Sequence, residues 1–126
     1  MGDVGFESAT LERLRESDPR YPEQAYVFVL LALSRVIGRL REPRHVSGRE
    51  LAIGCRDLAI ELYGPLARTV LEHWGICDTS AFGDLVFNLL EVGVLSKTEE
   101  DAREDFQRVF DFEEAFDRRY PWSPRA

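Results

Sequence analysis

The chain has almost no lysine and little cysteine. Lys97 is the single lysine among 16 basic residues, so nearly every positive charge is carried by an arginine. The two cysteines, Cys55 and Cys77, do not form a CxxC pair. Residues 1–9 lack the basic start and the apolar run of a signal peptide. We therefore expect free thiols and a cytoplasmic protein.

Long apolar runs and the common catalytic motifs are also missing. The longest apolar stretch, residues 25–33, is far too short to span a bilayer, so we expect no association with membranes. The chain has no glycine-rich phosphate loop, no paired metal-ligand spacing and no set resembling a catalytic triad. We therefore expect a protein that is not an enzyme, with no catalytic residues, no cofactor and no metal.

What is present indicates one globular domain with uneven charge. The 126 residues are 44% hydrophobic and 31% charged, which is typical of a folded domain. We expect one domain over residues 1–126, with frayed tails at 1–5 and 120–126. The formal net charge is −7. Counted along the chain, residues 1–75 carry −1 and residues 76–126 carry −6, so the acidic character lies in the C-terminal part.

Helical periodicity dominates the first three quarters of the chain. A first helix is predicted to end before the Asp18-Pro19 pair, because proline disfavours a helical conformation in the residue before it. Residues 22–41 form the most apolar helix. It is apolar on nearly all its faces, which is typical of a helix in the middle of a fold or at an interface.

The next helix has the clearest start signal. Ser47 and Glu50 have the spacing of a capping box, in which the side chain of each residue accepts a hydrogen bond from the backbone N–H of the other. Gly64 is predicted to end this helix. Two further helices are predicted, a short one over residues 65–75 and a longer one over residues 80–93.

The C-terminal part favours a β-hairpin. Residues 94–96 and 109–112 have the character of extended segments, and the acidic run TEEDARED lies between them. The order helix, short helix, tight turn at Gly75, helix and hairpin resembles a winged helix. The predicted fold is therefore mainly α with a small β-hairpin, a winged-helix-like domain preceded by one or two extra N-terminal helices. The alternative for residues 98–110 is a helix that starts at Thr98.

DNA binding through these elements is not favoured. A recognition helix presents Arg, Lys, Asn or Gln to bases and phosphates, but residues 79–92 offer only Asn88. The predicted wing is strongly acidic and would face phosphate. A winged helix of this charge is better suited to binding a partner protein.

Five stretches of the chain resemble a family of small uncharacterised bacterial proteins, a domain of unknown function known only by a locus-tag name. The resemblance spans about Phe6 to Phe116. It implies no activity and gives no functional residues. The stretches are AYVFVLLAL, HVSGRELAIG, YGPLARTVLEHWGI, FGDLVFNLLEVGVLSKTEEDAREDF and FDFEEAF.

Two charged groups are the candidate binding residues. The first is a patch for an anion or a partner at the joint between two predicted helices, formed by Arg39, Arg41, Arg44, His45 and Arg49. The second is an acidic partner surface, formed by Glu99, Glu100, Asp101, Glu104 and Asp105. The basic patch of one copy could pair with the acidic surface of another. The alternative is that neighbouring carboxylates neutralise the basic patch on the surface.

The remaining reactive residues give weaker hypotheses. His73 and Cys77 are close in sequence, but structural zinc usually needs a second close pair of ligands. Cys77 could act as a nucleophile with His73 as its base, yet no orienting group or oxyanion hole accompanies them. The acidic run lacks the pattern of a calcium loop. Ordinary structural or surface roles are favoured for all of these residues.

The sequence therefore favours a non-enzymatic protein-interaction or regulatory module that binds another protein or itself, as a homo-oligomer. The alternative is a nucleic-acid-binding protein that uses the Arg-rich region 35–56, although the net charge disfavours it. A small enzyme or a metal-binding protein is the third hypothesis.

Overall fold

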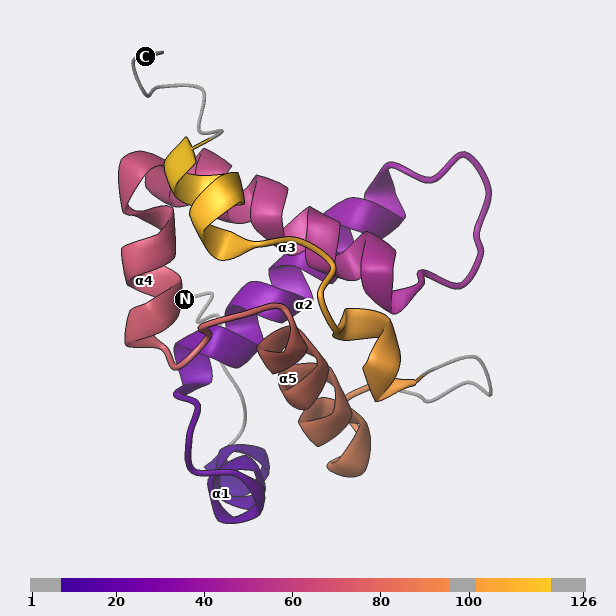
Figure 1. Cartoon of the computed structure of the whole chain (residues 1–126). Coiled ribbons are helices and arrows are strands. Elements are labelled where there is room, and N and C mark those ends of the chain that lie inside the picture. Colours follow the sequence, from indigo (N-terminus) through magenta and orange to yellow (C-terminus); the bar gives the residue numbers. More distant parts are fainter. Residues whose placement is uncertain (1–7, 96–101, 119–126) are drawn as a thin grey trace.

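The computed structural model describes residues 8–95 and 102–118, and every regular element in these two ranges is helical (Figure 1). The five α-helices are α1 (Ser8–Ser17), α2 (Glu23–Gly38), α3 (Gly48–Tyr63), α4 (Ala67–His73) and α5 (Ser80–Glu91). Three short helical turns are η1 (Gly64–Leu66), η2 (Arg103–Phe106) and η3 (Glu113–Arg118). None of the helices in this described part combines the length and apolarity needed to cross a membrane.

Local signals place the ends of α3 and α4. The Ser47 hydroxyl accepts from the Glu50 backbone N–H at 3.1 Å, and the Glu50 carboxylate accepts from the Ser47 N–H at 3.1 Å. This confirms the predicted capping box. Gly75, with φ of 86°, ends α4, and the next N–H, of Ile76, donates back to the Leu71 carbonyl. That bond turns the buried Ile76 into the core and directs the chain toward α5.

α2 lies in the middle of the fold, as its apolar character predicts. It packs against α3 and α5, while α4 packs on α3 and α1 reaches α5 (Figure 1). The close approach of α2 and α3 depends on Gly54, where a Cβ would collide with Val36. One hydrophobic core joins side chains from all five α-helices and from residues 106–116. The tails predicted to fray, 1–5 and 120–126, lie outside the described residues.

The predicted β-hairpin and winged helix are wrong, because residues 8–95 and 102–118 contain no strand. Gly93, with φ of 85°, ends α5, and its N–H donates to the Leu90 carbonyl. The N–H groups of Val94 and Leu95 both point back to the Leu89 carbonyl, at 3.0 and 3.4 Å. Since these donors are used to cap α5, residues 94–95 cannot begin the first strand of a hairpin.

The second predicted strand is replaced by an irregular segment that crosses α3 and α5. In Figure 1 the chain runs from η2, beside α5, up to η3, beside α4. Phe106, Phe112 and Phe116 are buried and anchor this segment to the helices. The Val109 N–H donates to the Thr79 hydroxyl rather than to a strand. The alternative of one long helix is wrong as well for residues 102–110, because η2 ends at Phe106, whereas residues 98–101 lie outside the described ranges.

Candidate functional site

An apolar groove of about 230 Å³ lies where α2, α3 and α5 meet η2. The second half of α2 and the α2–α3 loop form one side of it, and α5 with the segment after it forms the other. Its polar lining comes from the α2–α3 loop and the first residue of α3. Its apolar lining consists of Leu33, Ile37, Val46, Leu51, Val86, Leu90, Leu95 and Phe106.

The groove contains apolar surface that the fold does not cover. Ile37 lines it with 51% of its surface exposed. Val94 is 38% exposed and precedes Leu95, which lines the groove. In a folded protein, exposed apolar side chains that adjoin a groove are typical of a binding surface, whereas single scattered ones are not.

The α2–α3 loop and the first turn of α3 carry four arginines, Arg39, Arg41, Arg44 and Arg49, which we call the basic edge; of these, Arg44 lines the groove. Arg44 donates to both carboxylate oxygens of Glu50, at 2.9 and 2.7 Å. This bidentate pair lowers the pKa of Glu50 to about 2 and raises that of Arg44. The other three side chains are exposed, and no ion pair to them is found within the described residues. His45, the fifth residue of the predicted basic patch, is half-buried and lines the groove.

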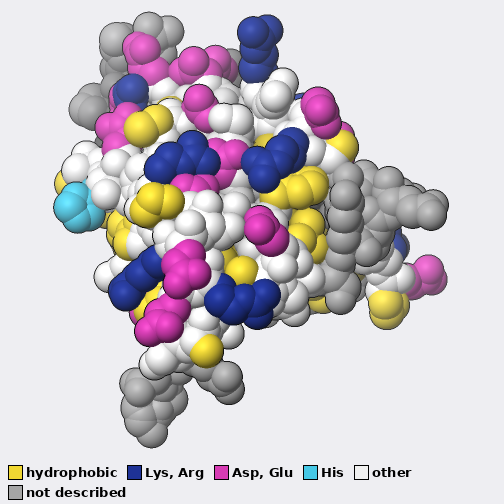
Figure 2. Space-filling view, turned by 90° about the horizontal axis from the view of Figure 1, so that it is seen from below, with side chains coloured by type: hydrophobic (Ala, Val, Ile, Leu, Met, Phe, Trp, Pro, Cys, Tyr) yellow, Lys and Arg dark blue, Asp and Glu magenta, His cyan; other side chains and the backbone are white. Residues whose placement is uncertain are grey.

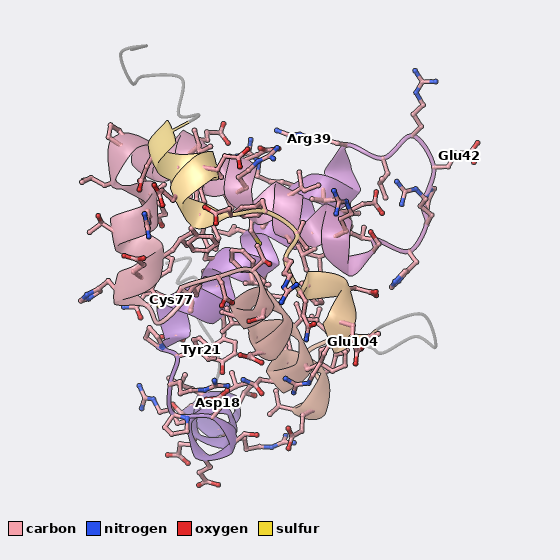
Figure 3. The ribbon with its side chains drawn as sticks, viewed as in Figure 1. Asp18, Tyr21, Arg39, Glu42, Cys77 and Glu104 are labelled. Carbon is pink, nitrogen blue, oxygen red and sulfur yellow. The ribbon has the colours of Figure 1, made fainter. Side chains whose placement is uncertain are left out.

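Part of the predicted acidic surface lies beside the start of α3. Glu104 and Asp105, which we call the acidic edge, are exposed on η2 directly before the groove-lining Phe106. Asp105 contacts the start of α3, since a Cβ built on Gly48 would lie 2.8 Å from the Cβ of Asp105. In Figure 3, Arg39 lies on the upper side of this region and Glu104 on the lower side. The other predicted acidic residues, Glu99, Glu100 and Asp101, lie outside the described residues.

The face of the molecule that carries α1 has mixed charge (Figure 2). Figure 2 views the molecule from below, the side on which α1 lies in Figure 1, and there the basic and acidic side chains are interspersed. Arg13 and Arg15 of α1 are exposed.

Neighbouring carboxylates neutralise much of the Arg-rich region 35–56. Arg35 pairs with Glu61 and Arg56 pairs with Asp57, in addition to the pair between Arg44 and Glu50. Exposed pairs of this kind contribute little to stability. They nevertheless reduce the positive field that a polyanion would meet.

Asn88, the residue predicted to be available for reading DNA bases, lies in the core. It is 5% exposed, and its Nδ2 donates to Asp18 Oδ2 at 2.9 Å and to the Tyr26 hydroxyl at 3.1 Å. A buried amide with these two partners ties α5 to α2 and to the turn after α1. Asn88 therefore cannot contact a base without unfolding of this region.

The sequence analysis missed the polar network to which Asn88 belongs. Arg20 donates two side-chain bonds of 2.8 Å to Asp18 and, together with the amide of Asn88, holds the pKa of that carboxyl at about 2. Asp84 accepts from the Tyr21 hydroxyl and from Arg103, both at 2.9 Å. The signal that could have revealed it is a polar Asn88 on the apolar stripe of its helix.

The network joins elements and does not have the properties of an acid–base site. A low pKa keeps Asp18 ionised near neutral pH, and burial together with the Asp84 carboxylate raises the pKa of Tyr21. Both groups therefore keep a fixed protonation state near neutrality, whereas general acid–base catalysis needs pKa values near the working pH. The network fastens α1, α5 and η2 together.

The cysteines and histidines show no metal centre within the described residues. Cys55 is fully buried, and burial raises the pKa of its thiol. Cys77 is exposed in a polar cleft at the start of α5, and His73 is exposed at the end of α4. No group of three or more metal-ligating side chains occurs among the described residues.

Comparison with protein-family models, with curated proteins and with solved structures gives no match for this chain. Over the described residues the protein is all-helical, with one hydrophobic core and an apolar groove beside charged residues. Any function must therefore be argued from the groove itself.

Proposed function

We propose that this protein is a non-enzymatic protein-interaction module and that the apolar groove is its binding surface. The observation that carries the proposal is Ile37, which is half-exposed while it lines the groove together with buried core residues. Burial of such a side chain by a partner removes apolar surface from water, which is the main favourable contribution to protein association.

The distribution of charge favours a protein over a nucleic acid as the partner. Arg35, Arg44 and Arg56 are paired with carboxylates, and the acidic edge adjoins the basic edge. Phosphate would be repelled by Glu104 and Asp105 when it approached Arg39 and Arg41, for which no ion pair is found among the described residues. A protein surface can present both signs of charge at once.

The experiment is affinity capture from a native lysate with the immobilised full chain and two matched variants. Ile37→Gln changes the groove, whereas Leu66→Gln changes another exposed leucine, 62% exposed on η1, that does not line the groove. Neither change alters the net charge. We expect the wild type and Leu66→Gln to retain the same proteins and Ile37→Gln to lose them.

Nuclease treatment of the lysate separates the two classes of partner. We expect the captured proteins to remain after treatment. The proposal fails if nuclease removes them, or if Ile37→Gln retains them as fully as the wild type does.

A further inference from the structure

We propose that an aromatic pocket at the start of α2 binds an alkylammonium cation, a positively charged nitrogen that carries methyl or longer alkyl groups. The pocket has a volume of about 340 Å³. It shares no lining residue with the apolar groove, so the two are separate surfaces. This second site does not depend on the function proposed for the groove.

Three aromatic rings from different parts of the fold line the pocket: Phe28 of α2, Tyr63 at the end of α3 and Trp74 directly after α4. The centroid of the Trp74 ring lies 5.7 Å from that of Phe28 and 5.8 Å from that of Tyr63. Phe28 is buried, whereas Tyr63 and Trp74 are half-buried. A cation within about 6 Å of a ring centroid is attracted by the π electrons. These rings are close enough to one another to act on a single cation.

The charged lining of the pocket is acidic. Glu23 lies in the first turn of α2 and lines the pocket, with Gln24 beside it. No arginine or lysine of the described residues contributes to the lining. A cleft whose charged lining has one sign concentrates ions of the opposite sign. The lining therefore favours a cation over an anion or a neutral molecule.

The protein already places cations over aromatic rings elsewhere. Within the described ranges three arginines lie over rings, with the guanidinium carbon 5.0–5.9 Å from the ring centroid: Arg20 over Tyr21, Arg56 over Phe110 and Arg103 over Phe87. No arginine or lysine of the same ranges lies over a ring of the aromatic pocket. A cation from outside the chain would take there the position that an arginine takes at the other rings.

The apolar part of the lining favours alkyl groups on the nitrogen. Leu31, three residues after Phe28, is 44% exposed and lines the pocket. Alkyl groups would cover this side chain and remove its apolar surface from water. A bare ammonium is compact and strongly hydrated, so it would lose more hydration in the pocket and gain less contact. An alkylated nitrogen therefore fits the lining better than an unmodified lysine side chain does.

The test is isothermal titration calorimetry of the full chain with choline, a quaternary ammonium, and with dimethylbutanol, its uncharged carbon isostere. We expect saturable binding of choline and at least roughly tenfold weaker binding of the isostere, because the isostere fills the same space without the charge. Fluorescence places the ligand. Trp122→Phe leaves Trp74 as the single tryptophan of the chain, and choline should change its emission.

Two variants and two matched controls separate the pocket from general effects. Trp74→Leu removes a ring of the pocket and Glu23→Gln removes its charge, and we expect each to weaken choline binding roughly tenfold. Phe87→Leu removes a ring and Glu91→Gln a carboxylate outside the pocket, so both should bind as the wild type does. Circular dichroism establishes that each variant keeps its helix content. Because Glu23→Gln removes no ring, the test does not depend on the folding of Trp74→Leu.

Two sources supply this chemistry, a free small molecule and a methylated lysine side chain of a protein. A short peptide that carries trimethyllysine, compared with choline, distinguishes them. Tighter binding of the peptide assigns the cation to a protein, and tighter binding of choline assigns it to a small molecule. The same peptide with unmodified lysine should bind more weakly than the trimethylated one.

The proposal is overturned if neither choline nor the trimethylated peptide binds. It is also overturned if dimethylbutanol binds as tightly as choline, if the unmodified peptide binds as tightly as the trimethylated one, or if either Trp74→Leu or Glu23→Gln binds choline as the wild type does. None of these outcomes bears on the groove, which Ile37→Gln and affinity capture test separately.

Discussion

The helical core and the segment 102–118 are built on different principles. In α2, α3 and α5, apolar side chains recur at helical spacing and the helices face one another along that stripe. Between residues 102 and 118, the buried side chains are three phenylalanines, Phe106, Phe112 and Phe116, with no constant spacing. Periodicity therefore describes the first region, whereas the second is explained by the places on the helical surface where an aromatic ring fits.

The aromatic rings of the second region are also held by one another. Phe110 and Phe112 are stacked with ring centroids 5.6 Å apart, and Phe116 packs edge-on to both. Phe112 reaches the core through Phe82 of α5, at 6.3 Å. Irregular backbone can therefore be as firmly anchored as a helix, provided that a few large side chains are buried. Four substitutions test whether the two regions unfold as one cooperative unit.

The largest expected effect is that of Phe106→Ala. Phe106 is 4% exposed and packs over Gly48 and Gly83, so its removal leaves a cavity between α3 and α5. We expect a loss of about 3–5 kcal/mol in the free energy of unfolding, as for a phenylalanine in a helical core. Urea denaturation measures it, with Phe82→Ala as the reference from α5. A loss below about 1 kcal/mol would mean that the segment does not belong to the cooperative core.

Gly83→Ala changes the same contact from the helical side. A Cβ at this position would lie 3.0–3.1 Å from Cβ, Cγ and Cδ2 of Phe106, so the ring must move. We expect a loss of about 1–3 kcal/mol from overpacking, although alanine is the better helix former. The control is Gly38→Ala, which meets nothing within 4 Å and should cost nothing. Equal thermal midpoints for the two variants would show that Phe106 does not press on α5.

The polar network gives the third prediction, which concerns pH. Asp18 has a pKa of about 2 in the folded protein, against 3.8 as the reference value. Because the folded-state pKa is lowered, its stabilising contribution is complete above about pH 4 and is lost as the pH falls to about 2. The size of the shift corresponds to about 2 kcal/mol.

Asp18→Asn isolates this contribution. We expect the variant to be less stable than the wild type at pH 7 and the difference to shrink by about 2 kcal/mol as the pH falls through this window. Urea unfolding at a series of pH values measures it. If the difference stays constant with pH, the link between α1 and α5 does not depend on the charge of Asp18.

The smallest effect comes from a purely local signal. Ser47→Ala removes one half of the capping box and leaves a backbone N–H of α3 without its partner. We expect a loss of about 1 kcal/mol. Ser34→Ala, at an exposed position within α2, serves as the control and should cost nothing. A loss at Ser47 as large as that at Phe106 would remove the contrast between local and tertiary contributions.

The helices could be predicted from the sequence because their signals are local. The Ser47–Glu50 box, the Asp18-Pro19 boundary and the glycine at 75 act within one helical turn. The structure follows them to within a few residues, as the start of α3 and the end of α1 show. The all-round apolar character of residues 22–41 also correctly placed α2 in the middle of the fold.

The hairpin was wrong because a short apolar run has no local feature that separates a strand from an anchored coil. Val109, Phe110 and Phe112 fit either. Contacts with residues distant in sequence favour the irregular segment over a strand. The Thr79 hydroxyl accepts from the Val109 N–H, and the Phe82 ring lies beside Phe112. The buried amide of Asn88 was missed for the same reason, because its partners, Asp18 and Tyr26, lie more than 60 residues away.

The candidate site was only half visible in the sequence. The charged residues could be identified as two groups, but sequence gives no distance between residues 39–49 and 104–105. The apolar lining between them could not be identified, because Ile37 and Leu90 look like ordinary core positions on their own helices. Only the packing of α2, α3, α5 and η2 leaves Ile37 half-exposed in a groove.

The sequence by itself determined where the helices begin and end and how charge is distributed along the chain, because caps, prolines and glycines act on neighbouring backbone groups. The tertiary structure alone decided the course of residues 102–118, the burial of Asn88 and the exposure of Ile37 at the apolar groove. Those features depend on space between helices that are distant in sequence, and such space exists only once the helices have packed.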